Sequence, residues 1–145
     1  MLTGKTLENY ASLIIKIGVN LQKGQGLEIA CPVEKYSFAR ALAKAGYKAG
    51  AKIVKIRWMD EDIDKLNYEY ASLETLKDIP KYEIDSRNYL VDNGFCRVAV
   101  SAEDPSAFKN LDAQKIGEVA KARAKALKKY FEEKKSFSRI FSTFS

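Results

Sequence analysis

The chain has 145 residues, 46% hydrophobic and 11% aromatic, which is enough for one domain with a real core and excludes a disordered chain. It contains no histidine, so Ser/His/Asp and Cys/His nucleophile systems and most zinc sites are excluded. The net charge of +6 arises after residue 120, because residues 1–120 hold 17 Lys and Arg against 17 Asp and Glu. A single basic segment at one end of a chain is more typical of a solvated helix face than of a nucleic-acid-binding surface.

The N-terminal part predicts a strand-helix-strand unit that follows a first helix. Residues 6–20 place apolar side chains at the three-four spacing of a helix, and the apolar run at residues 27–31 predicts a buried strand. A second helix is predicted over residues 34–50 and a second strand over residues 53–58. Because such crossovers are right-handed, the two strands are expected to be parallel. The predicted fold class is therefore α/β, a layered domain with a small, mainly parallel sheet flanked by helices.

Further helices and a third strand are predicted in the rest of the chain. Acidic residues 60–64 open a helix whose inward positions are predicted to be Ile63, Leu66 and Tyr70. The remaining predicted elements are a short helix at residues 73–76, a helix over residues 83–92, a strand over residues 95–101, and a long helix from its N-cap Asp112 to about Lys135.

Composition changes abruptly at Ser136. The last ten residues, SFSRIFSTFS, mix serine with three phenylalanines, and no capping or turn residue joins them to the preceding helix. Exposed phenylalanines are a liability on a monomer. We therefore assign residues 1–135 to one α/β domain and residues 136–145 to a tail that is not part of the native fold, either the start of a further element or a non-native extension.

Cys31 and Cys96 lie far apart, each in a predicted strand, where a small buried thiol is the usual role. The sequence has no apolar run near ~18 residues and no charged-then-apolar leader. We expect a soluble protein that neither spans nor binds a membrane, located in the reducing cytoplasm.

The carboxylates of residues 60–64 are the most site-like cluster. A calcium loop that starts at Asp60 would need glycine at its sixth position and glutamate at its twelfth, where the chain has Lys65 and Ala71. Carboxylates in the first turn of a helix are stabilised by its unpaired N–H groups and its dipole. Helix capping is therefore favoured over metal binding.

Ligands of an open parallel sheet gather beyond the carboxyl ends of its strands. Those ends carry Cys31, Glu34, Trp58, Asp60, Ser101 and Glu103. We take Glu34, Asp60 and Glu103 as substrate-cavity candidates, because three converging carboxylates form an acidic crevice that attracts a substrate ammonium. The alternative, which is commoner for loop carboxylates, is ordinary solvated surface.

The whole pattern resembles the thermophilic metallo-aminopeptidase family, which includes aminopeptidase T, aminopeptidase S and PepS-type enzymes. The resemblance spreads over about residues 5–130, and no single stretch carries it alone. The segments that carry it are LENYASLIIKIGVNLQKGQGLEI from Leu7, FARALAKAGYKAGAKIV from Phe38, LNYEYAS from Leu66, EDPSAFKNLD from Glu103 and KARAKAL from Lys121.

The resemblance implies the N-terminal domain of a cytoplasmic, usually homodimeric exopeptidase that removes N-terminal residues from peptides. In the family, two divalent metal ions of zinc or cobalt type are held by glutamates, histidines and an aspartate of a second domain. None of these ligands can be carried over, because the matching positions do not exist in this chain. We therefore expect no catalytic and no metal-ligating residue here, and a chain that is inactive alone. The parent reaction implied is metal-assisted hydrolysis.

An alternative from another class is a stand-alone, non-enzymatic binding module that uses the acidic crevice or the basic C-terminal helix. That helix has an apolar face made mostly of alanine, so membrane affinity is expected to be weak. Its seven Lys and Arg are expected to bind nucleic acid weakly and without sequence preference.

Overall fold

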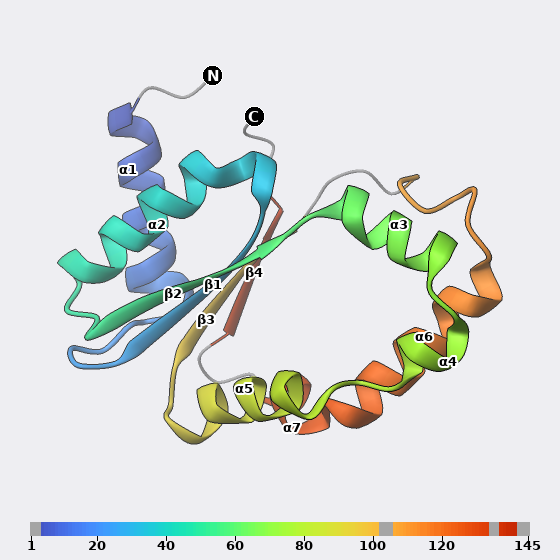
Figure 1. Cartoon of the computed structure of the whole chain (residues 1–145). Helices are drawn as coiled ribbons and strands as arrows, with labels where there is room; N and C mark the ends of the chain where they lie inside the picture. Colours follow the sequence, from blue (N-terminus) through green and yellow to red (C-terminus); the bar gives the residue numbers. More distant parts are fainter. Residues whose placement is uncertain (1–3, 102–105, 134–136, 142–145) are drawn as a thin grey trace. The chain divides into compact units, whose positions relative to one another are not determined.

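The computed structural model describes residues 4–101 and 106–133 in full, and residues 137–141 as backbone. The chain divides into two compact units. The first unit comprises residues 1–59, 93–103 and 134–145, and the second comprises residues 60–92 and 104–133. All four strands lie in the first unit, whereas the described part of the second is helical (Figure 1).

The first unit is built on a parallel sheet with the strand order β2-β1-β3-β4. Its strands are β1 (Gly26–Pro32), β2 (Ile53–Met59), β3 (Cys96–Ser101) and β4 (Phe137–Phe141). Its helices are α1 (Gly4–Leu13), the π-helical turn η1 (Ile14–Gly18), the 3₁₀ turn η2 (Val33–Lys35) and α2 (Tyr36–Lys48). The predicted α/β class, with a parallel sheet and flanking helices, is confirmed.

The core of this unit lies between one sheet face and the layer of α1 and α2 (Figure 1). Alternate residues of β1 and β3 point into it, as the two-residue period of a strand requires. Its most buried members are Ala11, Ile15, Leu27, Ile29, Cys31, Phe38, Leu42, Cys96, Val98 and Val100. Helix α2 approaches β1 so closely that a Cβ at Gly46 would lie 2.6 Å from Cδ2 of Leu27, which explains why glycine occupies this helical position.

The first helix is shorter than the predicted residues 6–20. Helix α1 ends at Leu13, and the chain widens into η1, where the Val19 N–H donates to the Ile14 carbonyl at 3.0 Å across one residue more than an α-helix spans. Asn20 then adopts φ 50°, a left-handed conformation that ends the helical run.

The second unit contains five helices among its described residues. They are α3 (Glu61–Tyr70), α4 (Leu73–Lys77), α5 (Lys81–Asp92), α6 (Ala113–Ala126) and α7 (Lys128–Glu132). The predicted cap is confirmed, because the Asp112 carboxylate accepts hydrogen bonds from the backbone N–H groups of Gln114 and Lys115. The single long helix predicted from Asp112 is in fact two, because the buried Leu127 leaves the helical conformation at φ −106° and ψ 24°.

The predicted inward face of α3 is wrong. Ile63, Leu66 and Tyr70 are 51%, 47% and 82% exposed, and α3 has no buried residue. Their spacing correctly places them on one helix face, but the spacing carries no information on whether another element covers that face. The helix is instead fixed at its two ends, by the cap of Asp60 and by a hydrogen-bonded lysine from α6.

The segment at residues 137–141 has a partner strand that was not predicted from the sequence. Strand β4 pairs in parallel with β3, with Arg97 opposite Phe137 and Ser101 opposite Phe141. A parallel partner can lie anywhere in the sequence, so the absence of a neighbouring strand signal did not exclude pairing. The assignment of residues 136–145 to a tail outside the native fold stays a prediction, and β4 is the observation that weighs against it.

Candidate functional site

The carboxyl ends of β1 and β2 lie at the same edge of the sheet. Pro32, the last residue of β1, is opposite Met59, the last residue of β2. The segments that leave these strands therefore start side by side, with η2 after β1 and Asp60 after β2. This is the edge at which open parallel sheets bind ligands.

The three predicted cavity carboxylates have different surroundings. Asp60 uses its carboxylate as the N-cap of α3, with Oδ1 accepting from the backbone N–H of Asp62 at 3.0 Å and of Ile63 at 3.4 Å. The predicted capping role is thereby confirmed for Asp60. Glu34 lies exposed on η2 and makes no hydrogen bond or ion pair with the described residues. Glu103 lies outside the described residues, so convergence of the three carboxylates stays a prediction.

Cys31 is buried directly behind this edge, as predicted. Its Sγ donates to the carbonyl oxygens of Pro32 at 3.4 Å and Lys35 at 3.5 Å. Burial, and next the negative charge of Glu34, raise the pKa of the Cys31 thiol to about 11. We therefore expect the thiol to be protonated near neutral pH, which disfavours a role as a nucleophile. Cys96 is also buried, with its Sγ 3.9 Å from the Val19 carbonyl.

Three large apolar side chains are exposed at this edge. Val33 is 43% exposed, Tyr36 49% and Trp58 46%. Trp58 is opposite Cys31 in the parallel register. The position of Trp58 at a strand end follows from the sequence, but its exposure does not, because exposure depends on what covers the sheet edge in the folded chain.

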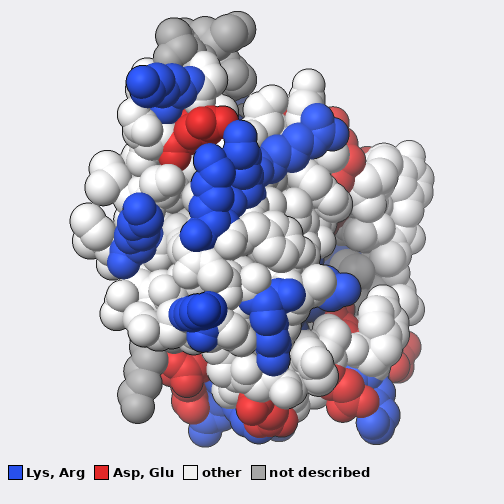
Figure 2. Space-filling view, turned by 90° about the vertical axis from the view of Figure 1, so that its left-hand side faces the viewer, with Lys and Arg blue, Asp and Glu red and all other residues white. Residues whose placement is uncertain are grey.

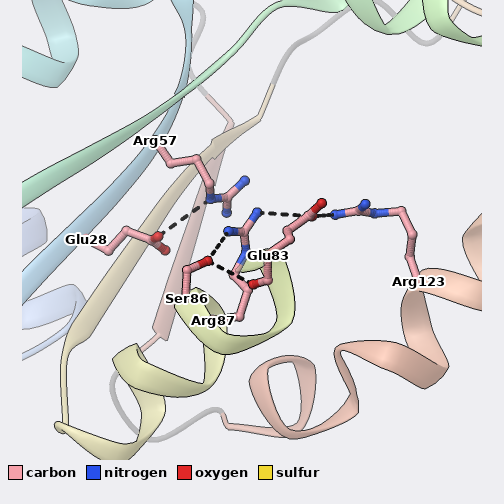
Figure 3. Close-up of polar contacts among 6 residues, drawn as sticks. All are labelled: Glu28, Arg57, Glu83, Ser86, Arg87 and Arg123. Atoms are coloured by element: carbon pink, nitrogen blue, oxygen red, sulfur yellow. Dashed lines mark hydrogen bonds and ion pairs between the residues drawn. The ribbon is translucent and has the colours of Figure 1, made fainter. Parts of the chain in front are cut away.

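The second sheet face of the first unit carries charged residues. Glu28 and Arg97 are in register and only 5% and 3% exposed, and Nε of Arg57 lies 3.5 Å from Oε2 of Glu28 (Figure 3). In the second unit, Glu83 forms ion pairs with Arg87 at 3.7 Å and with Arg123 (Figure 3). In both groups the charges are buried or half-buried and lie next to an opposite charge, because an unpaired charge is costly to bury. The ion pair of Glu83 with Arg123 also connects α5 to α6.

The pKa of the Asp64 carboxyl, in the first turn of α3, is raised. Partial burial is the main cause, the charge of Asp60 adds to it, and Arg123 opposes it. These neighbours belong to helix ends and to the Arg123 network, so the shift follows from packing within the second unit. We assign Asp64 no role in binding.

The described residues do not fit a dinuclear metal centre. Within residues 4–101 and 106–133, no group of three or more Cys, Asp and Glu side chains is placed to hold a metal ion. The whole sequence contains no histidine, and the Cys31 thiol is buried and protonated. This chain therefore supplies no metal-ligating set of its own among its described residues.

Charge is segregated between the two units. The first unit carries 14 Lys and Arg against four Asp and Glu, a net +10, whereas the second carries 11 against 15, a net −4. Figure 2 shows Lys and Arg side chains spread over the side of the first unit that carries α1 and α2. The exposed cations of these two helices are Lys5, Arg40, Lys44 and Lys48. Lys44 is paired with Glu8 at 2.9 Å, which lowers the pKa of the Glu8 carboxyl.

No helix within the described part of the chain is both long enough and apolar enough to cross a membrane.

A family model of thermophilic metalloproteases (M29) matches residues 3–143. The chain is 36% identical over 124 residues to aminopeptidase AmpS of Bacillus subtilis, and 33% identical over 128 residues to aminopeptidase T of Thermus thermophilus. These matches cover 86% and 88% of this chain but only 30% and 31% of the two relatives. The solved structure of wild-type AmpT from Thermus thermophilus superimposes with a TM-score of 0.86 at 29% identity, over 97% of this chain and 36% of that one.

Proposed function

This chain belongs to the thermophilic metalloprotease (M29) family, and from this membership we propose that it forms the N-terminal domain of a metal-dependent aminopeptidase that removes N-terminal residues from peptides. The relatives it matches are named aminopeptidases, and the chain spans about 30% of their length. The agreement of fold over nearly the whole chain is the observation that carries the proposal.

We propose that catalysis is performed outside this chain. The described residues offer no metal-ligating set, and the exposed strand ends offer binding groups instead. The role of this domain is then to form one wall of the substrate cavity or to support the dimer of the parent enzyme. Two divalent metal ions, a homodimeric parent and a cytoplasmic location are parts of the same proposal, taken from the family resemblance.

The first prediction is that the purified chain hydrolyses no amino-acid amide or dipeptide, even with added zinc, cobalt or manganese. The reason is that no described cluster of side chains is placed to hold a metal. The measurement is release of free amino acid over time, with a full-length relative such as aminopeptidase T as the positive control. Metal-dependent turnover that copurifies with this polypeptide and is lost on Glu34→Gln, Asp60→Asn or Glu103→Gln would contradict it.

A further inference from the structure

We propose that the outer face of α3 in one copy of this chain docks onto the outer face of α1 and α2 in a second copy. The α3 face consists of the exposed apolar residues Ile63, Leu66 and Tyr70, with the exposed acidic residues Asp62 and Glu69 beside them. The inference goes beyond the proposed function, because it concerns self-association of the chain and requires no catalytic activity.

Helix α3 is folded with its apolar side outwards. The three apolar residues of the α3 face are spaced three and four residues apart, so they share one side of the helix, and all three are exposed. The half-buried side instead carries Glu61, Lys65 and Tyr68. The Tyr68 ring packs edge to face on Phe108, with the ring centroids 5.8 Å apart. The second unit therefore uses the more polar side of α3 for its own packing and leaves the apolar side exposed, which is typical of an interaction surface.

The charge beside the α3 face is negative. Asp62 and Glu69 are two helical turns apart, so they lie on the same flank of the apolar side. Neither carboxylate makes a hydrogen bond or ion pair with the described residues. Together with its N-cap Asp60, α3 carries five carboxylates and one lysine. A partner for this face must therefore present apolar side chains with cations beside them.

The chain itself has such a surface on α1, η1 and α2, which we call the basic face. Leu13 and Ile17 are 55% and 75% exposed there, about one helical turn apart. The ion pair of Lys44 with Glu8 joins α1 to α2, so the outer sides of the two helices form one surface (Figure 2). The charged residues of these three elements are Lys5, Lys16, Arg40, Lys44 and Lys48, against Glu8 as the one acidic residue. Five cations and one carboxylate thus face the five carboxylates and one lysine of α3.

The charge of the two units favours a second copy as the partner. The first unit has a net charge of +10 and the second a net charge of −4. A contact between the second unit of one copy and the first unit of another therefore brings opposite charges together, whereas a contact between two like units is repulsive. Nucleic acid does not fit the α3 face, because phosphates are repelled by its carboxylates. Two different surfaces meet in this contact, so it either closes into a dimer or ring or continues as an open chain.

Sedimentation velocity of the full chain at increasing concentration measures the association. The interface is small, so we expect weak and reversible self-association. Raising the salt concentration from about 0.1 to about 1 M should weaken it, because exposed charges are screened over about 3 Å instead of about 10 Å. A chain that stays monomeric at all concentrations at low salt would overturn the proposal.

Charge reversal tests each surface separately. One variant carries Asp62→Lys and Glu69→Lys on the α3 face, and the other carries Lys16→Glu and Lys48→Glu on the basic face. All four positions are exposed, and α3 has no buried residue, so both variants should fold, which circular dichroism verifies. Each variant alone should associate at least about tenfold more weakly than the unmodified chain, because two exposed attractions become repulsions.

Mixing the two variants identifies the partner. The basic face of the first variant and the α3 face of the second are unmodified, so the mixture should associate although neither variant does so alone. If the second variant associates as well as the unmodified chain, the α3 face binds something other than the basic face and the proposal is wrong. A mixture that stays monomeric would contradict it equally.

Two further substitutions are matched controls in the second unit. Glu74→Lys reverses an exposed carboxylate in the first turn of α4, as Asp62→Lys does in α3, and should leave association unchanged. Leu66→Ala removes apolar surface from the α3 face and should weaken association, whereas Tyr82→Ala removes a 76% exposed ring from α5 and should not. Equal effects of Leu66→Ala and Tyr82→Ala would show that the α3 face is not the contact.

Discussion

At the scale of single residues, burial decides the chemistry of the thiols. Cys31 and Cys96 are both fully buried in the core of the first unit, and neither forms a disulfide. For Cys31, the same environment that packs the sulfur also disfavours its ionised form, which raises the pKa. We therefore expect the Cys31 thiol to be unreactive in the folded chain.

We expect native Cys31 to resist alkylation by iodoacetamide at about pH 8, because a thiol with a pKa of about 11 holds almost no thiolate there. Mass spectrometry of the native and the urea-unfolded chain measures this, and both cysteines should react only when unfolded. Rapid modification of Cys31 in the native chain would contradict the assignment.

The same shift makes stability depend on alkaline pH. The thiol pKa is raised from 9.0 to about 11 on folding, so the folded state holds the proton more tightly than the unfolded state. The contribution of Cys31 is complete below pH 9.0 and is lost as pH rises from there toward about 11. In Cys31→Ala, the free energy of unfolding should therefore fall less steeply across that range.

At the scale of elements, helix ends are held by a few charged contacts. The Lys115 ammonium donates to the carbonyl oxygens of Tyr68 at 2.6 Å and Ala71 at 2.7 Å. A cation at the carboxyl end of a helix satisfies unpaired carbonyls and complements the helix dipole. This contact fixes α3 to α6 even though α3 buries no residue of its own.

Lys115→Met should lower the free energy of unfolding by about 1.5–3 kcal/mol, the cost of losing hydrogen bonds from a charged, partly buried donor. Urea denaturation measures the change. Lys121→Met, at an exposed position of α6, is the matched control and should change stability by less than about 0.5 kcal/mol. Equal effects of the two substitutions would show that the hydrogen bonds from Lys115 to α3 do not contribute to stability.

A close approach of side chain to backbone fixes the start of β1. A Cβ at Gly26 would lie 2.5 Å from ring atoms of Phe95, whose side chain is buried. Gly26→Ala should destabilise the chain by about 1–3 kcal/mol through overpacking.

Gly117→Ala is the control for this substitution. Gly117 lies inside α6, and no atom lies within 4 Å of a Cβ added there. Alanine should stabilise this position by about 0.5–1 kcal/mol, because glycine is unfavourable inside a helix. Thermal denaturation of both variants tests the pair, and a neutral Gly26→Ala would refute the close contact with Phe95.

At the scale of the whole molecule, basic and acidic residues are divided between the two units, which cannot be seen from the order of the residues in the sequence. Residues 1–120 are neutral in total, but the fold assigns their basic part to the first unit and their acidic part to the second. The exposed cations of α1 and α2 therefore give the first unit a basic surface of its own (Figure 2), in addition to the basic residues of the C-terminal helix in the second unit. Nucleic acid is still expected to bind without sequence preference, because cations on a helix surface contact phosphates rather than bases.

We expect affinity for single-stranded DNA to be weak and to fall at least about tenfold between about 50 and 200 mM salt, because counterions are released on binding. Filter binding or fluorescence anisotropy measures this. Neutralising Arg40 and Lys48 together should weaken binding as much as neutralising Lys121 and Lys125, since both pairs are exposed. Sub-micromolar, sequence-selective affinity at physiological salt would instead support the stand-alone binding module.

The sequence by itself determined the features that depend on neighbouring residues. Periodicity predicts the parallel β1-α2-β2 unit and the burial of the two cysteines. Short-range hydrogen bonding explains the N-caps Asp60 and Asp112. The presence of Glu34 at a strand end could also be predicted, because it follows directly from the position of β1.

Only the tertiary structure decided what covers each surface. Three features depend on segments that are far apart in the chain: the exposure of the apolar face of α3, the pairing of β4 with β3, and the separation of charge between the units. The same is true of the exposure of Trp58, which lies opposite Cys31 in the register of β1 and β2. Local patterns specify which face of an element is apolar, whereas burial requires a second element, and that element is set by the packing of the whole chain.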